Sequence, residues 1–257
     1  MASTRIRVVD RVVDILSCFS ISSPELGVTE IGKMLELDKA TVCRILLTLE
    51  SRGFVRSNPL SRRYSIGPKL LELARVGAEN VAVSTEALPH MRWLRDQTGE
   101  TVLLSIRLGF EYVYAQQLES THEIRRTVQI GRSGPLHCAA PGKVILAYLP
   151  EEEIERFFST MELVRFTDRT VTDPVVLRAS LKEIRARGYA LSCGERIPGS
   201  ISFAAPVWDH TAAVVASMAV SLPSTRYTPE RNEEYAMPTR VAAERLSAAL
   251  GAPRPPA

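Results

Sequence analysis

Apolar residues recur with helical spacing in the first part of the chain. Positions three and four residues apart predict a first helix over residues 6–20. Thr29 stands where its hydroxyl would cap a short second helix, and Asp38 stands where its carboxylate would cap a third, after a break at residues 36–38. Gly53 is placed to end the third helix. The apolar face of the third helix consists of Val42, Ile45, Leu46 and Leu49.

The residues that follow the third helix predict a hairpin. Residues 54–56 and 63–66 have the composition of short strands, and Asn58 and Pro59 between them favour a turn. Two helices joined by a short turn and followed by a basic hairpin are typical of a winged helix-turn-helix module. The alternative is a three-helix unit that contacts other proteins.

The remainder of the chain alternates helices and strands, which predicts an α+β domain with a mainly antiparallel sheet. We expect helices at 85–98, 174–187 and 229–250, a loop leading into a helix at 136–149, and strands at 102–107, 111–117, 189–193, 201–208 and 213–222. A helix that starts at Pro68 joins the two parts, and a helix of this size needs a partner in water, for which a second copy of itself is suitable. The expected domains are a winged module at 1–67, a linker helix for dimerisation at 68–83, a larger domain at 84–251 and a disordered tail at 252–257.

Composition limits the class of protein. The chain has 257 residues, of which 45% are hydrophobic and 24% charged, as in soluble globular proteins rather than disordered or fibrous ones. The longest apolar stretch, around 212–222, is too short to cross a membrane, and Asp10, Arg11 and Asp14 argue against a signal peptide. Four scattered cysteines indicate reduced thiols. We therefore expect a cytoplasmic protein.

Positive charge is concentrated near the start of the chain. The net charge is +3, and residues 1–68 contain ten basic and seven acidic side chains, whereas the remainder is neutral. Residues 39–69 carry seven basic side chains against one acidic residue, Glu50. Such clustering is expected of a surface that binds a polyanion, and a solvated basic face is the alternative.

We expect the third helix and the hairpin to bind double-stranded DNA. Ala40 is small enough to let the start of the helix enter the major groove, and Arg44 can pair with a guanine edge. Threonines near helix starts can bind phosphates, and Arg62 and Arg63 suit the minor groove or flanking phosphates. The candidate DNA-binding residues are Thr29, Lys39, Ala40, Thr41, Cys43, Arg44, Thr48, Arg56, Arg62 and Arg63.

The larger domain lacks the motifs of common enzymes. Its sequence contains neither a glycine-rich nucleotide loop nor a nucleophile elbow, so no cofactor is expected. The four histidines lie far apart, without a companion at metal-ligand spacing, so no metal site is expected.

A small-molecule pocket is the interpretation that the larger domain favours. Residues 136–142, which include His137, form a run of small groups that leads into a helix. The free N–H groups and partial positive charge of a helix start suit a carboxylate ligand. A polar loop at residues 192–202 leads into a strand and is a second candidate wall.

Serines on the predicted strands are candidates for ligand contacts. Alternation along the strands places Ser200 and Ser202 on one face, and it places Ala219 and Ser221 on one face of the next strand. Buried hydroxyls need partners, which a bound ligand could supply. Hydrogen bonds to local backbone or to water are the alternative.

Several separate motifs, in one order along the chain, resemble the IclR-type bacterial transcriptional regulators. The stretch GVTEIGKMLELDKATVCRILLTLESRGFVRSNPLSRRYSIGPKLLELA is similar to the winged module and linker helix of that family. The stretches GPLHCAAPGKVILA, IRARGYALSCGERIPGSISFAAPVWD and VVASMAVSLPSTRYT are similar to its effector-binding domain. The resemblance extends from Val8 to about Leu250.

The resemblance implies a GAF-like effector-binding domain, dimers that can pair into tetramers, and control of a catabolic operon by a small organic acid, aromatic acids included. It places the effector at Ala140, Pro141, Ser192, Ser200, Ser202, Ala219 and Ser221, and His137 lies in the same motif. The family commonly has a cysteine at the position of Ser202 and a serine at the position of Ala219. The hydroxyl that is missing at Ala219 favours a slightly less polar effector. Glu36 replaces the usual glycine of the helix-turn-helix turn.

We expect the effector to change the relative positions of the winged modules through the linker helix. It can do so only if it binds one arrangement of the modules more tightly than the other. Two other functions stay open. The larger domain could turn over its ligand as an enzyme, or Cys138 or Cys193 could act as a redox sensor.

Overall fold

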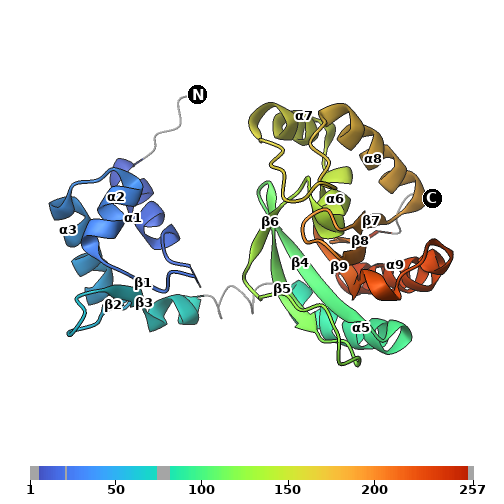
Figure 1. Cartoon of the computed structure of the whole chain (residues 1–257), viewed down its shortest axis with the longest axis horizontal. Helices are drawn as coiled ribbons and strands as arrows, with labels where there is room; N and C mark the ends of the chain where they lie inside the picture. Colours follow the sequence, from blue (N-terminus) through green and yellow to red (C-terminus); the bar gives the residue numbers. More distant parts are fainter. Residues whose placement is uncertain (1–5, 21, 74–81, 254–257) are drawn as a thin grey trace. The chain divides into compact units, whose positions relative to one another are not determined.

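The computed structural model describes residues 6–20, 22–73 and 82–253. The chain divides into two compact units, Met1–Asn80 and Val81–Ala257. The first unit contains α1 (Arg7–Ser17), α2 (Val28–Leu35) and α3 (Lys39–Ser51), followed by a hairpin of β2 (Val55–Ser57) and β3 (Tyr64–Ile66), as Figure 1 shows.

Local signals in the sequence fix the ends of α3. The carboxylate of Asp38 accepts a hydrogen bond from the Thr41 N–H at 2.8 Å, as the predicted cap requires. Gly53 follows the helix with φ +75°, a left-handed conformation that favours glycine. The core of the unit buries the predicted apolar face of the helix, which consists of Val42, Ile45, Leu46 and Leu49. The opposite side of α3 is therefore left at the surface.

The start of α2 differs from the prediction. Its cap is Gly27 and not Thr29, which lies exposed in the first turn. The carboxylate of Glu30 accepts a hydrogen bond from the Gly27 N–H at 2.7 Å, so this helix start has its polar contact without a hydroxyl cap. Glu36, in the turn between α2 and α3, has φ +54°, which is strained for a residue with a side chain.

Two other parts of the first unit were less accessible to prediction. β1 (Glu25–Leu26) pairs with β3, which gives the sheet order β1-β3-β2, and a strand of two residues has no periodicity to detect. The predicted linker helix begins at Pro68 and is helical to Leu73. Residues 74–81, which contain the rest of that linker, and residues 254–257 of the expected disordered tail lie outside the described residues.

The second unit is built on a six-stranded sheet with the order β6-β5-β4-β9-β8-β7. The strands are β4 (Thr101–Leu108), β5 (Glu111–Leu118), β6 (Ser133–Pro135), β7 (Ala190–Cys193), β8 (Ser200–Trp208) and β9 (Val214–Pro223). The helices are α5 (Ala82–Thr98), α6 (Ala139–Ala147), α7 (Glu151–Thr160), α8 (Pro174–Arg187) and α9 (Asn232–Ala249). Each neighbouring pair of strands is antiparallel, so the predicted α+β class is confirmed. The short strand β6, which contains Gly134 and Pro135, was not predicted.

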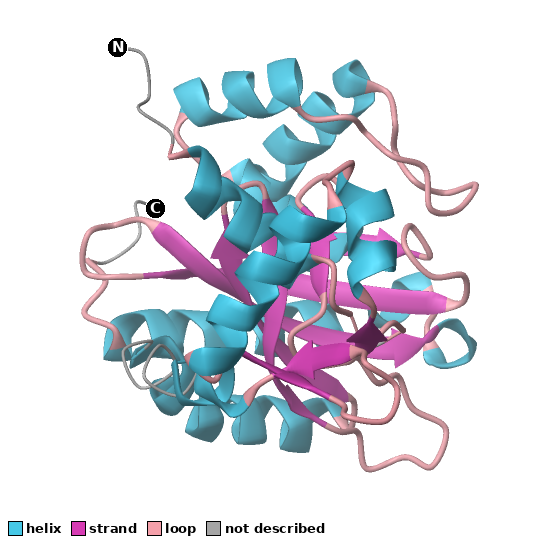
Figure 2. Ribbon diagram, turned by 90° about the vertical axis from the view of Figure 1, so that its left-hand side faces the viewer, coloured by secondary structure: helices cyan, strands magenta, loops and turns pink. Residues whose placement is uncertain are grey.

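Helices cover both faces of this sheet (Figure 2). α6, α7 and α8 pack on the face that carries Leu103, Ala204 and Ala219. α5 and α9 pack on the other face, which carries Phe203 and Val220. Because neighbouring residues of a strand point to opposite faces, the serines of β8 and β9 that the sequence singled out share the α6 face. That face contains a pocket beside the start of α6.

Candidate functional site

α3 carries the predicted DNA-binding residues on the surface that faces away from the core. Thr41 and Cys43 are half-buried. The other residues of this surface are exposed, and they are Lys39, Ala40, Arg44 and Thr48. A helix with a small residue near its start and basic residues in its first two turns has the shape and charge to enter a major groove.

The basic side chains of this surface carry free charges. Within the described part of the first unit, the ion pairs are Arg63 with Glu30 and Lys69 with Glu72. Lys39 and Arg44 belong to neither pair, so their charges stay available for phosphates or base edges. Thr29 lies exposed at the start of α2, where the helix dipole favours an anion.

The hairpin arginines are of two kinds. Arg62 is exposed and has φ +54°. The guanidinium of Arg63 instead donates to the Glu25 carbonyl at 2.9 Å and pairs with the Glu30 carboxylate at 2.9 Å. Arg56 is exposed and donates to the Ser65 hydroxyl at 3.1 Å. Arg63 therefore ties the hairpin to the start of α2, whereas Arg62 carries a free charge at the predicted wing.

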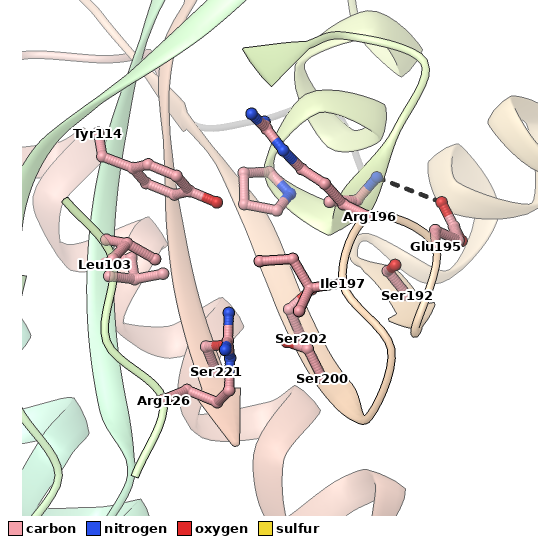
Figure 3. A pocket seen from close by; sticks show the side chains of 13 residues that line it. Leu103, Tyr114, Arg126, Ser192, Glu195, Arg196, Ile197, Ser200, Ser202 and Ser221 are labelled. Atoms are coloured by element: carbon pink, nitrogen blue, oxygen red, sulfur yellow. Dashed lines mark hydrogen bonds between the residues drawn. The ribbon is translucent and has the colours of Figure 1, made fainter. Parts of the chain in front are cut away.

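The second unit contains a pocket of about 400 Å³, including space open to solvent, between the start of α6, the polar loop at 194–199 and the sheet (Figure 3). The lining residues are Leu103, Tyr114, Arg126, Val128, Ala139, Pro141, Ser192, Glu195, Arg196, Ile197, Ser200, Ser202 and Ser221.

Five of the predicted effector residues meet in this pocket. They are Pro141, Ser192, Ser200, Ser202 and Ser221. The hydroxyl of Ser221 lies 3.5 Å from the Ile201 carbonyl, which is a weak hydrogen bond. Ser192, Ser200 and Ser202 come from β7 and β8, and within the described residues their hydroxyls have no protein partner. These hydroxyls are available to a ligand, which weakens the alternative of local backbone bonds.

Three other predicted effector residues do not line the pocket. Ala140 and Ala219 are fully buried in the core between α6 and the sheet, and the neighbouring Ala139 lines the pocket instead. His137 is buried, with Nε2 3.0 Å from the Val164 carbonyl and its ring stacked on Phe166. Burial lowers the pKa of His137, so this ring is neutral at physiological pH and packs as part of the core.

A buried carboxylate of the chain itself occupies the start of α6, where the sequence predicts a carboxylate ligand. Glu195 accepts a hydrogen bond from the Ala139 N–H at 3.2 Å and forms an ion pair with Lys143 of α6. The ammonium of Lys143 also donates to the Leu191 carbonyl at 3.3 Å. Sequence reasoning missed this pair because its members lie far apart along the chain. The one available signal was a lysine within an apolar helix, which needs a partner when buried.

Two arginines line the pocket without a carboxylate partner. Arg196 donates to the Tyr112 hydroxyl at 2.9 Å and to the Ser133 carbonyl at 2.6 Å. A Cβ on Gly134 would lie 1.6 Å from Nη1 of Arg196, so only glycine leaves room for this guanidinium. The Nε of Arg126 is buried, and it has no hydrogen-bond partner within the described residues. The pocket therefore favours an anionic ligand.

Cys138 and Cys193, the two candidates for a redox sensor, lack a lowered thiol pKa. Burial raises the pKa of Cys138 to about 11 and also raises the pKa values of Cys18 and Cys193. A reactive thiol needs the opposite shift, since the thiolate is the nucleophile. Cys138 is fully buried as well.

The described residues contain no group of three or more histidine, cysteine, aspartate or glutamate side chains that could hold a metal ion. In that same part of the chain, no helix combines the length and hydropathy that a membrane span requires.

Comparisons with known proteins agree with this division into two parts. A family model described as "IclR helix-turn-helix domain" matches residues 8–59. A second one, described as "Bacterial transcriptional regulator IclR C-terminal", matches residues 77–248. Together these matches include both candidate sites.

Whole proteins of similar length also match. The HTH-type transcriptional regulator BhcR of Paracoccus denitrificans is 36% identical over 249 residues, which cover 97% of this chain and 88% of that protein. The HTH-type transcriptional regulator KdgR of Escherichia coli is 33% identical over 247 residues, which cover 94% of each chain. The crystal structure of an IclR transcriptional regulator from Alicyclobacillus acidocaldarius matches with a TM-score of 0.83 at 29% identity, covering 95% of this chain and 98% of that one.

Proposed function

Because the chain belongs to the IclR family of bacterial transcriptional regulators, we propose that it binds operator DNA through α3 and the hairpin, and that a small organic acid in the pocket changes this binding. The observation that carries the proposal is the presence, in one chain, of a helix with exposed basic residues and a pocket lined by two arginines that lack a carboxylate partner. The family consists of transcriptional regulators, which argues against the enzyme alternative.

The DNA-binding part of the proposal rests on the surface of α3. Arg44 is exposed in the second turn and suits a guanine edge, and Ala40 permits close approach of the helix to the groove. Lys39 and Arg62 supply charges for phosphates. A homodimer would present two such helices to two half-sites, and a pair of dimers would present four. Exposed apolar side chains on α1, among them Val9 and Val13, support self-association.

The ligand part of the proposal rests on the polar lining of the pocket. The residues that line one space include three serines, Ser192, Ser200 and Ser202, and two arginines, Arg126 and Arg196. These groups suit an acid that carries further hydrogen-bonding atoms better than they suit a plain aromatic acid. Acids of this kind are common carbon sources, so we propose that the regulated genes belong to a catabolic operon.

A DNA-binding assay with matched variants tests the first part. The purified protein is titrated onto its own promoter-proximal DNA, as wild type, as Arg44→Ala and as Arg92→Ala. Arg92 is exposed on α5, so its loss removes the same charge away from α3. We expect Arg44→Ala to bind more weakly and Arg92→Ala to bind like the wild type. Equal binding by all three proteins would contradict the assigned role of α3.

A further inference from the structure

The charged side chains of the pocket do not balance. Three of them line it, namely Glu195, Arg126 and Arg196. The Glu195 carboxylate is already neutralised by Lys143, and both side chains of that pair are more than nine-tenths buried. Neither arginine pairs with a carboxylate in the described part of the chain. The Arg196 guanidinium lies 5.7 Å from the ring centres of Tyr112 and Phe166. Two positive charges are nevertheless left without a negative partner in a partly enclosed space, which is unfavourable.

The two arginines lie at opposite ends of the pocket. In Figure 3, Arg126 lies beside Ser221 of β9, Arg196 lies on the side of Tyr114, and Ile197 is between them. A ligand with one anionic group could satisfy one end only. A ligand with an anionic group at each end would satisfy both.

Both arginines have donors to offer. Arg196 is held in place by the Tyr112 hydroxyl and the Ser133 carbonyl, and these two bonds use only two of its five N–H donors. The buried Nε of Arg126 has no protein acceptor within the described residues, which is costly unless a ligand supplies one. The walls between the two ends include the apolar side chains of Leu103, Val128 and Ile197.

We propose that the effector is a short aliphatic dicarboxylate, with one carboxylate bound by Arg126 and the other by Arg196. This inference rests on the proposed function, because it assumes that the pocket is the effector site. The hydroxyls of Ser202 and Ser221, which line the same space, are placed to donate to the ligand as well. Arg126 is then the residue that distinguishes a dicarboxylate from a monocarboxylate of the same length.

Calorimetry with matched acids tests the inference on the full-length protein. The probes are succinate, glutarate and adipate, compared with butanoate, pentanoate and hexanoate, and monomethyl adipate, which keeps both ends and lacks one charge. We expect at least one dicarboxylate to bind about tenfold or more tightly than its monocarboxylate partner, and adipate to bind more tightly than monomethyl adipate, because a charge-assisted contact is lost in each comparison. Equal affinities within each pair would overturn the inference.

Two variants test whether Arg126 is responsible for the preference for dicarboxylates. Arg126→Met removes the charge and keeps most of the side-chain volume, and Arg125→Met is its control. Arg125 is adjacent, pairs with Glu119 at 2.7 Å and does not line the pocket. We expect Arg126→Met to bind dicarboxylates and monocarboxylates alike, and Arg125→Met to keep the preference. A preference that survives in Arg126→Met, with thermal unfolding unchanged, would refute the role of Arg126.

The failure of this inference and the failure of the proposed function look different. If monocarboxylates bind as tightly as dicarboxylates and change DNA binding, the proposed function stands and the dicarboxylate is wrong. If no acid of the panel binds and none changes DNA binding, both are contradicted.

Discussion

Replacing Lys143 by methionine tests the buried ion pair that holds the pocket loop against α6. The side chains of Lys143 and Glu195 are only 6% and 9% exposed. Without the ammonium, the Glu195 carboxylate stays buried with the Ala139 N–H as its remaining donor, at 3.2 Å. Removal of one partner of a buried pair typically costs about 3–5 kcal/mol. We expect the free energy of unfolding of the second unit to fall by a similar amount.

The double variant Lys143→Met, Glu195→Met separates the cost of losing the ion pair from the cost of burying an unpaired carboxylate. It leaves the Ala139 N–H without its acceptor, which costs about 1–3 kcal/mol, but it leaves no unpaired charge. The double variant should therefore be more stable than Lys143→Met alone. This non-additivity is the expected result for two groups in direct contact.

Tryptophan fluorescence during urea unfolding measures these changes in the relevant unit. Both tryptophans of the chain, Trp93 and Trp208, belong to the second unit. The midpoint and slope of the transition give the free energy of unfolding for the wild type, both single variants and the double variant. The reasoning is refuted if Lys143→Met unfolds like the wild type, or if the double variant loses the sum of the two single losses.

Three other predictions concern the DNA-binding surface and the thiols. Arg44→Ala should weaken operator binding by about 1–3 kcal/mol, measured by fluorescence anisotropy on a promoter-proximal duplex, because it removes a base contact; an affinity equal to that of Arg92→Ala would count against base contact. Arg62→Ala should lower the slope of log affinity against log salt by about one, because one phosphate contact is lost. An unchanged slope would exclude a wing contact by Arg62. Arg63→Ala should mainly destabilise the first unit, because Arg63 pairs with Glu30. Cys138 should resist alkylation in the native protein at pH 8, since its pKa of about 11 leaves only about 0.1% thiolate; rapid labelling of Cys138, detected by mass spectrometry, would restore the redox alternative.

The features that the sequence predicted are those fixed by neighbouring residues. Asp38 caps α3 through a residue three positions away, and the apolar face of α3 follows directly from its spacing. Alternation alone placed Ser200 and Ser202 on one side of β8, where both line the pocket. Thr29 failed as a cap because Glu30, one residue further, supplies the carboxylate that binds the helix start.

The features that it missed depend on residues far apart in the chain. Arg126 lies between β5 and β6, and Arg196 lies between β7 and β8, at the other end of the strand order. Both line one pocket, and no local pattern indicates this. The Lys143–Glu195 pair has the same origin. Ala219 shares a face with Ser221, as predicted. Ser221 lines the pocket, whereas Ala219 is fully buried in the core.

The central claim is that one chain couples a DNA surface to an acid in the pocket. It is tested most directly by titrating the wild type and Arg126→Met onto a promoter-proximal duplex, with and without each acid of the panel at saturating concentration. Coupling between two sites is typically worth about 5- to 150-fold in affinity. The expected result is a change of that size for at least one acid with the wild type, and a much smaller one with Arg126→Met. An acid that calorimetry shows to be bound, and that leaves DNA affinity unchanged, would contradict the claim, as would the absence of DNA binding at low salt.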